Sequence, residues 1–155
     1  TFETWHQSVS AAMQADAVPD PEAMKKNMYD CVDSKCKFYP PTYFTAWEGR
    51  DEMLLLLTCV SEVFGKSFQY GRQWVSPDGR DWALEFTAQI GDSKKGITGI
   101  DLVKLDENGK IVEFTVLARP PNGVAELKSQ MMQKVPPRLA KLKLQQGLGS
   151  IFGSS

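Results

Sequence analysis

The chain has 155 residues, of which 42% are hydrophobic and 24% are charged, and its net charge is -1 with a sequence pI near 5.8. This length and balance predict a single globular domain with enough apolar side chains to form a core. They exclude a broad basic surface for nucleic acid, and no apolar run reaches the length of a membrane-spanning helix.

The first third of the sequence predicts two helices. Phe2, Trp5 and Val9 recur at helical spacing, which indicates an amphipathic helix over residues 2 to 16. A second helix is expected over residues 21 to 33, because a proline suits its first turn. The paired prolines in "CKFYPPTYF" then favour an extended segment.

A third helix is predicted over residues 50 to 64, in "GRDEMLLLLTCVSEVFG". Its apolar residues surround nearly the whole helix, so we expect it to be buried, and Gly65 is expected to end it.

The second half of the chain changes to a period of two residues, which is typical of strands. Four segments are expected to form strands: "SFQYGRQWV", "WALEFTAQI", "ITGIDLVKL" and "IVEFTVLARP". The turn sequences "SPDGRD", "GDSKKG" and "DENGK" join them. Alternation places two sets of side chains on single faces, namely Trp82, Leu84, Phe86, Ala88 and Ile90, and then Val112, Phe114, Val116 and Ala118.

This order of elements predicts an α+β domain over residues 1 to 127. We expect a curved, cone-shaped antiparallel or mixed sheet with three N-terminal helices packed over its concave face. The inside of such a cone is a suitable pocket for a small molecule.

The C-terminal segment, residues 128 to 155, is predicted to be a separate basic helix or tail. It carries five basic residues and no acidic residue, so the rest of the chain has a net charge of -6. A helix lying on the acidic body is expected, with contact to a partner or an anionic membrane as the alternative. Gly147, Gly149 and Gly153 are expected to end any helix there.

The cysteine and histidine content argues against a metal centre. Cys31, Cys36 and Cys59 form no metal-ligand pattern, and His6 is the single histidine. An odd number of widely spaced cysteines favours reduced thiols. With no signal peptide recognised, the expected location is the cytoplasm. No phosphate-binding loop is present, and no cofactor is implied.

One residue of the third predicted strand is unusual. Asp101 lies in "GIDLVKL", a segment whose apolar residues suggest burial on both faces. A buried carboxylate without partners is unfavourable, and burial raises its pKa, so near neutral pH it is suited to act as a proton donor or a tuned base. The alternative is a structural carboxylate that binds a backbone amide or an arginine such as Arg119.

The segments "YPPTYFTAWEGRDEMLLLLTCVSEVFG" and "GIDLVKLDENGKIVEFTVLARP" resemble the SnoaL-like, nuclear-transport-factor-2-like superfamily. This superfamily includes polyketide cyclases, ketosteroid isomerase and limonene epoxide hydrolase. The resemblance covers residues 1 to about 127 and implies the cone fold. It identifies the fold better than the activity, because the fold hosts many chemistries and some proteins that are not enzymes.

The resemblance also implies a role for Asp101, which falls at the position of a pocket aspartate of ketosteroid isomerase. That aspartate stays protonated and donates a hydrogen bond to the substrate oxyanion; this enzyme is a standard example of a neutral catalytic acid. Polyketide cyclases use an acid/base aspartate in the corresponding region. The resemblance therefore implies that Asp101 points into the cone toward a ligand.

Two other groups of the isomerase are missing. Tyr39 stands where its general-base aspartate precedes a proline, and "SAAMQ" stands where the first helix carries its oxyanion tyrosine. The epoxide hydrolase pattern also fails, since Ala118 lies near the place of its second aspartate.

Further candidates for the site come from the predicted inner face and its rim. Tyr39 and His6 are candidate second catalytic donors, with a rim aromatic and a surface histidine as the respective alternatives. Trp47, Phe86, Phe114 and Val116 are candidate ligand-binding residues, although a packing role for Trp47 is the alternative.

Two functions follow. One is a cofactor-independent isomerase, cyclase or hydratase that acts on a small apolar molecule through Asp101. The other is a non-catalytic ligand-binding or dimerisation module. A homodimer through the outer sheet face is expected for both, because the strand around Asp101 is apolar on both faces and the superfamily commonly pairs in this way.

Overall fold

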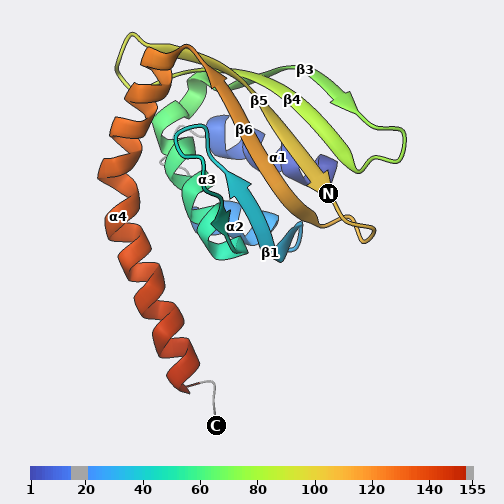
Figure 1. The fold of residues 1–155 in the computed structure, drawn as a ribbon, viewed down its shortest axis with the longest axis vertical. Helices are drawn as coiled ribbons and strands as arrows, with labels where there is room; N and C mark the ends of the chain where they lie inside the picture. The colour runs from blue at the N-terminus through green and yellow to red at the C-terminus, as the bar shows by residue number, and fades with distance from the viewer. Residues whose placement is uncertain (15–20, 153–155) are drawn as a thin grey trace.

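In a computed structural model, which describes residues 1–14 and 21–152, the chain forms a curved six-stranded sheet with helices on its inner side (Figure 1). The helices are α1 (Phe2–Gln14), α2 (Pro21–Tyr29), α3 (Arg50–Phe64), the short 3₁₀ turn η1 (Gly65–Ser67) and α4 (Pro121–Phe152). The strands are β1 (Val32–Tyr39), β2 (Trp47–Glu48), β3 (Gln69–Val75), β4 (Asp81–Gln89), β5 (Gly96–Leu105) and β6 (Ile111–Arg119).

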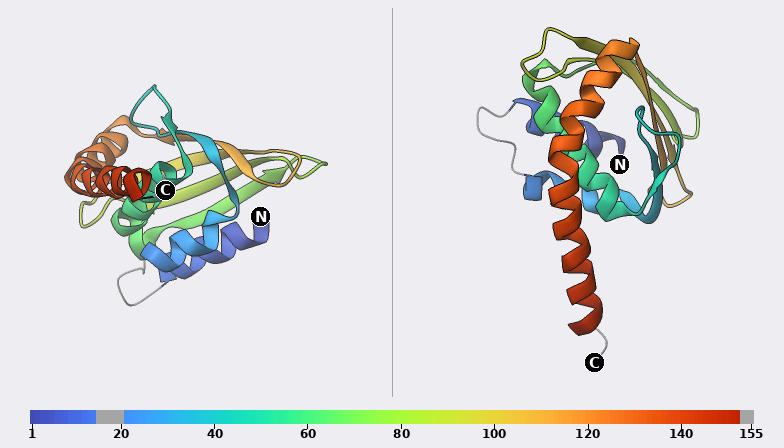
Figure 2. Two further views of the ribbon diagram at one scale, coloured as in Figure 1. Left: turned by 90° about the horizontal axis from the view of Figure 1, so that it is seen from below. Right: turned by 60° about the vertical axis from the view of Figure 1, so that its left-hand side comes forward.

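The sheet has the strand order β2-β1-β6-β5-β4-β3. β1 and β6 run parallel, whereas all other neighbours are antiparallel. Seen from below, the sheet curves around α1, α2 and α3, which lie on its concave side (Figure 2). The predicted α+β architecture with a mixed, curved sheet is therefore confirmed.

The alternation predicted for β4 is also confirmed. Its inward-facing residues are all buried: Trp82, Leu84, Phe86 and Ala88, followed by Ile90 just after the strand. At the start of β6 the sequence prediction is wrong, because Ile111 rather than Val112 is fully buried. The register shifts by one residue between the pairs Lys104–Glu113 and Leu105–Ile111, and such a bulge changes which side chain faces the core.

The turns and the third helix formed where they were expected. Gly79 and Gly109 both have a φ of 75°, a left-handed conformation that glycine adopts without strain. α3 ends at Phe64, and Gly65, with a φ of 51°, follows it. The buried side of α3 includes Met53 and Leu54, which packs the helix into the centre of the molecule.

The second helix is shorter than predicted. α2 ends at Tyr29 rather than at residue 33, because Val32 already pairs with Ile111 in the sheet. The first helix is described to Gln14, and residues 15 and 16 of its expected range lie outside the described residues.

The C-terminal helix differs most from its prediction. α4 runs without a break through the expected boundary at residues 127 and 128, and continues past Gly147 and Gly149, which were expected to end it. Each glycine costs a helix only about 1 kcal/mol relative to alanine. Pro136 and Pro137 also lie inside the helix. A proline has no N–H group, so the backbone carbonyl group four positions before it lacks its helical partner. The residues at those positions are exposed, so water can bond these carbonyl groups.

Ion pairs hold the basic side of α4 on the acidic side of α3. Lys134 and Arg138 both bind Glu62, and Lys143 binds Glu52. The last part of α4 extends beyond the sheet and the other helices (Figures 1 and 2). Within the described part of the chain, even this helix is too polar to cross a membrane.

Candidate functional site

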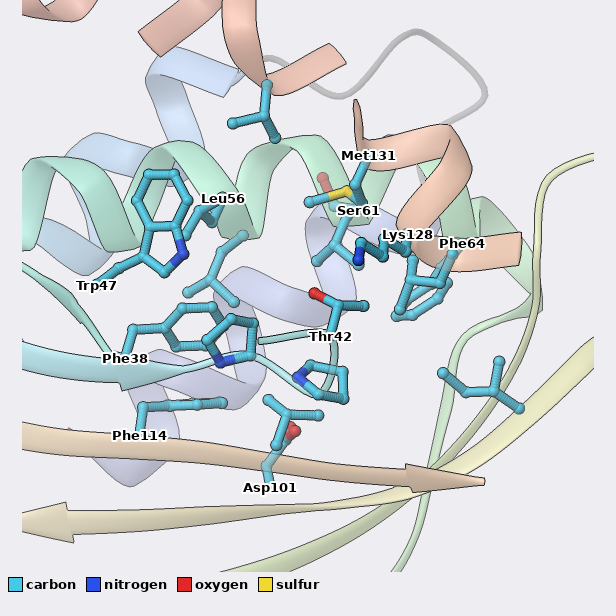
Figure 3. Close-up of a pocket in the computed structure, with 18 of the residues that line it drawn as sticks. Phe38, Thr42, Trp47, Leu56, Ser61, Phe64, Asp101, Phe114, Lys128 and Met131 are labelled. Carbon is cyan, nitrogen blue, oxygen red and sulfur yellow. The ribbon is translucent and has the colours of Figure 1, made fainter. Parts of the chain in front are cut away.

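A cavity of about 340 Å³ lies inside the cone. The inner face of the sheet forms one wall, and α3 and α4 form the opposite walls (Figure 3). The loop between β1 and β2 contributes Pro40, Pro41, Thr42 and Tyr43. Most side chains around the cavity are apolar, so the few polar groups among them determine what chemistry it can support.

Asp101 lies on the sheet wall of this cavity and points into it (Figure 3). Alternation along β5 places it on the buried face with Ile97 and Val103, and it is 6% exposed. Its partners in the neighbouring strands are Leu84 and Val116. The carboxyl group therefore lies among apolar side chains, where its charged form is poorly solvated.

A short hydrogen-bond chain reaches Asp101. The indole Nε1 of Trp5 donates to the Tyr70 hydroxyl oxygen at 3.1 Å, and that hydroxyl donates to Asp101 Oδ2 at 3.4 Å. Because an indole N–H can only donate, it directs the Tyr70 proton toward the carboxyl group. The second bond is long and therefore weak. Among the described residues no other side chain or amide bonds the carboxyl group, which leaves Oδ1 for a ligand.

The protonation of this pair follows from burial. Desolvation raises the pKa of Asp101 from 3.8 to about 8, and the hydrogen bond from Tyr70 only partly opposes it. Burial, together with the nearby Asp101, also raises the pKa of Tyr70 well above its ordinary value. At neutral pH both groups are therefore mainly protonated, and Asp101 is close to the pKa at which it can also accept a proton.

Arg119 is not the partner of Asp101 that the alternative interpretation expects. It is exposed and pairs with Thr98, which lies on the face of β5 opposite to the face that carries Asp101. No arginine therefore neutralises Asp101 among the described residues.

Tyr39 does not line the cavity. Phe38 is buried on the inner face, so alternation turns its neighbour Tyr39 to the other face, opposite Thr115. The expectation that Tyr39 is a donor at the pocket mouth therefore lacks the required geometry.

His6 is also outside the residues that line the cavity. Its Nδ1 lies 2.8 Å from the Phe2 carbonyl oxygen, and its Nε2 lies 3.0 Å from Gln73 Oε1. Its ring packs beside Tyr70, with a centroid separation of 5.2 Å. His6 thus supports Tyr70 from α1 but does not itself reach the cavity.

The four candidate ligand-binding residues do line the cavity: Trp47, Phe86, Phe114 and Val116. Phe114, on β6, and Trp47, on β2, both face the cavity (Figure 3). That they contact a ligand remains a prediction.

Sequence reasoning missed Tyr70 and Lys128, which are two of the few polar residues around the cavity. Extrapolating the pairs Val75–Trp82 and Gln73–Leu84 would place Tyr70 opposite Thr87, on the outer face. A shift of register between Gln73 and Tyr70 instead pairs Tyr70 with Phe86 on the inner face. Lys128 was grouped with the C-terminal tail, although it lies in the part of α4 that covers the cavity.

The described residues contain no group of three or more histidine, cysteine, aspartate or glutamate side chains placed to hold a metal ion. What the cavity offers is a proton donor and acceptor, Asp101, beside a second hydroxyl group in apolar surroundings. Such a pair can polarise a carbonyl oxygen or stabilise an enolate.

Searches with protein-family models and among curated proteins found no match to this chain. Solved structures do match. A steroid delta-isomerase from Pseudomonas aeruginosa is 28% identical, with a TM-score of 0.74 over 90% of this chain and 91% of that protein. An uncharacterised bacterial protein with a cystatin-like fold from Silicibacter pomeroyi is 30% identical, with a TM-score of 0.71 over 94% and 96%.

A third structure shows the same fold at a lower identity. It is an NTF-2 like protein of unknown function from Burkholderia xenovorans, 21% identical, with a TM-score of 0.52 over 77% of this chain and 86% of that protein. These matches agree with the mixed sheet, the helix order and the resemblance found in the sequence. The chain has the nuclear-transport-factor-2-like fold, in the form that it shares with the steroid delta-isomerase and the Silicibacter pomeroyi protein.

Proposed function

We propose that the protein binds a small apolar molecule in the cavity and acts on it as a cofactor-independent isomerase or cyclase. The observation that supports this most strongly is Asp101, a buried carboxyl group with a pKa raised to about 8 and no charged partner among the described residues. Its placement in an apolar cavity, rather than in an ion pair, is what acid/base chemistry on an apolar substrate requires.

The proposed reaction uses both protonation states of Asp101. The protonated carboxyl group gives its proton to a carbonyl oxygen of the substrate, and the resulting carboxylate removes a proton from the adjacent carbon, which leaves a neutral enol and restores the acid. The acid then protonates the far end of the enol system, and the carboxylate takes back the enol hydroxyl proton, so that the carbonyl reforms and Asp101 ends protonated as it began. Tyr70 keeps its proton throughout, since its pKa is raised, and its hydroxyl orients the carboxyl group.

A non-catalytic binding protein is the second candidate. Asp101 is the only carboxylate among the described residues that line the cavity, and the tyrosine and histidine expected to assist it lie elsewhere. A single acid/base group is sufficient for a tautomerisation, but it also suits a site that only hydrogen-bonds an oxygen atom of a ligand.

Isomerisation of a β,γ-unsaturated cyclic ketone, followed by the absorbance of the conjugated product, tests the proposal. Asp101→Asn keeps the size of the side chain but removes the exchangeable carboxyl proton, so activity should fall by about 100-fold or more. Asp81→Asn, at an exposed position on the same sheet, is the matched control and should keep full activity. Equal rates for Asp101→Asn and the wild type would exclude Asp101 as the acid/base group.

The binding alternative predicts a different result. The wild type and Asp101→Asn would then both fail to accelerate the reaction, while ligands would still bind in the cavity. Native mass spectrometry after incubation with a metabolite extract would detect a retained apolar molecule, and binding without turnover would favour this second candidate.

We also propose that the outer face of the sheet pairs two copies of the chain. Three apolar side chains of this face are exposed: Trp74 on β3 (49%), Leu102 on β5 (40%) and Leu117 on β6 (57%). A partner copy would cover them. Leu117→Glu would place a charge in this surface and should convert the dimer to a monomer in light scattering. A monomeric wild type at micromolar concentration would contradict the proposal.

A further inference from the structure

Lys128 is the single cation among the described residues around the cavity. It is exposed, so it lies where the cavity meets solvent, next to Tyr43 and Met132, which are also exposed lining residues. Its Nζ is 4.9 Å from the centroid of the Tyr43 ring, a cation–π distance. This contact holds the ammonium group at the rim of the cavity.

The direction of Lys128 is visible in the close-up of the cavity. Its side chain extends from α4 toward the interior, while Asp101 points inward from the sheet on the opposite side (Figure 3). Thr42, from the loop between β1 and β2, also lines the cavity. The cavity therefore has a cationic side at Lys128 and a carboxyl side at Asp101, with apolar side chains around both.

The other basic residues that α4 directs at the body are already paired. Lys134 and Arg138 bind Glu62, and Lys143 binds Glu52. No carboxylate among the described residues lies within ion-pair distance of Lys128, which therefore contributes a positive charge that the protein does not neutralise locally.

We propose that the molecule bound in this cavity is an apolar monoanion of the carboxylate class. It places its anionic group at Lys128 and a hydroxyl or carbonyl oxygen at Asp101 and Tyr70. This inference rests on the proposed function, because it names the ligand class of the same site.

The physical reason is the desolvation of Lys128. A neutral apolar ligand would displace water from the ammonium group without replacing its interactions, whereas a carboxylate would pair with it. One lysine matches one negative charge. A phosphate dianion would need more donors than this rim provides, and arginine forks usually supply them.

The two polar sides also fix the orientation of such a ligand. An anionic group placed at Asp101 would meet a carboxyl group in apolar surroundings and disfavour its ionisation further, so the anion is expected at the rim. The hydroxyl of Thr42, which also lines the cavity, is available as a second donor.

A hydroxynaphthoic acid and its methyl ester, which share a ring system and a hydroxyl group, are the probes for this inference. Their fluorescence on titration with the protein gives both affinities. The wild type should bind the acid about two- to fivefold more tightly than the ester, since the pair lies at a partly exposed site. Added salt should weaken binding of the acid and leave the ester unchanged.

The variants assign this preference to one side chain. Lys128→Gln should remove the preference for the acid and leave the affinity for the ester unchanged, whereas Lys128→Arg should keep it. Lys141→Gln, at an exposed position of α4 outside the cavity, is the matched control for the loss of one positive charge and should behave as the wild type. Circular dichroism verifies that each variant is folded.

Two results would overturn the inference, and they differ in what they say of the proposed function. Equal affinities for acid and ester, unchanged in Lys128→Gln, would reject the anionic ligand and leave an apolar-ligand site in place. Failure of both probes to bind would reject the anionic ligand and the proposed apolar-ligand site together.

Discussion

Two carboxyl groups of this protein, the partly buried Glu62 and the buried Asp101, lie in different surroundings. Glu62, in α3, is bound by the guanidinium of Arg138 at 2.8 and 2.9 Å and by the ammonium of Lys134 at 3.2 Å. Asp101, on the sheet, receives one long hydrogen bond from a phenol. The first carboxyl group fastens two helices to each other, while the second faces a cavity.

The pKa values of the two groups shift in opposite directions, because cations bind Glu62 and none of the described part of the chain binds Asp101. Burial alone would raise the pKa of Glu62, but the hydrogen bonds from Arg138 and Lys134 outweigh burial and lower it. At Asp101 burial dominates, and the pKa rises to about 8. A carboxylate with a structural role is neutralised by the protein, whereas Asp101 is not, and that contrast is the main argument for its functional role.

Replacement of Asp101 by asparagine should give the largest effect on stability, and the effect should depend on pH. Folded Asp101 has a raised pKa, so its contribution to stability is present below about pH 4 and is lost as the pH rises to about 8. Asparagine does not titrate, so the Asp101→Asn variant does not lose this contribution. Between about pH 4 and about pH 8, its free energy of unfolding relative to the wild type should therefore increase by up to ~1.4 kcal/mol per pH unit.

Urea unfolding of the wild type and Asp101→Asn between about pH 5 and about pH 9 measures this difference. A difference that stays constant with pH would mean that the folded carboxyl group titrates as it does in the unfolded chain.

Glu62→Gln should have a smaller effect with the opposite dependence on pH. The variant leaves Arg138 and Lys134 without a carboxylate, which should destabilise the protein by about 1–2 kcal/mol at neutral pH, since both cations are partly exposed. Folded Glu62 has a lowered pKa, so its contribution is present above about pH 4.5 and is lost in acid.

The same unfolding experiment, repeated in acid, should show the difference between Glu62→Gln and the wild type decreasing. Glu126→Gln, which removes a more exposed pair with Lys95, is the control and should change the stability less than Glu62→Gln does. A larger loss in the control than in Glu62→Gln would contradict the account of this interface.

Tyr70→Phe should give the smallest change in stability. Removal of the hydroxyl leaves the buried Trp5 indole N–H without its acceptor, at a cost of about 1 kcal/mol. It also removes the bond that lowers the pKa of Asp101, so that pKa should rise further. Thermal unfolding measures the first effect and titration of Asp101 the second; an unchanged or lower pKa would show that the hydroxyl does not bond the carboxyl group.

Much of the fold could be predicted from the sequence because its determinants are local. The apolar period of Arg50–Phe64, the turn glycines 79 and 109, and the alternation from Trp82 to Ile90 each depend on a few neighbouring residues. The inward direction of Asp101 was implied by the family resemblance, whereas the apolar residues around it predicted burial on both faces and β5 buries only one.

The parts that sequence reasoning missed depend on non-local structure. The bulge in β3 that turns Tyr70 inward is fixed by pairing with β4 and is not marked by any turn residue. α4 continues through Gly147 and Gly149, and packing with α3 fixes its earlier part. The sequence therefore assigns Lys128 to a tail, whereas the helix places it at the rim of the cavity.

Titration of the Asp101 side-chain carboxyl carbon by NMR, assigned with the Asp101→Asn variant, tests the central claim most directly. The account predicts a midpoint of about 8, which would establish a protonated carboxyl group in the cavity at neutral pH. A midpoint close to the ordinary value of 3.8 would mean that the carboxylate is charged and solvated or paired, and would contradict the proposed acid/base role.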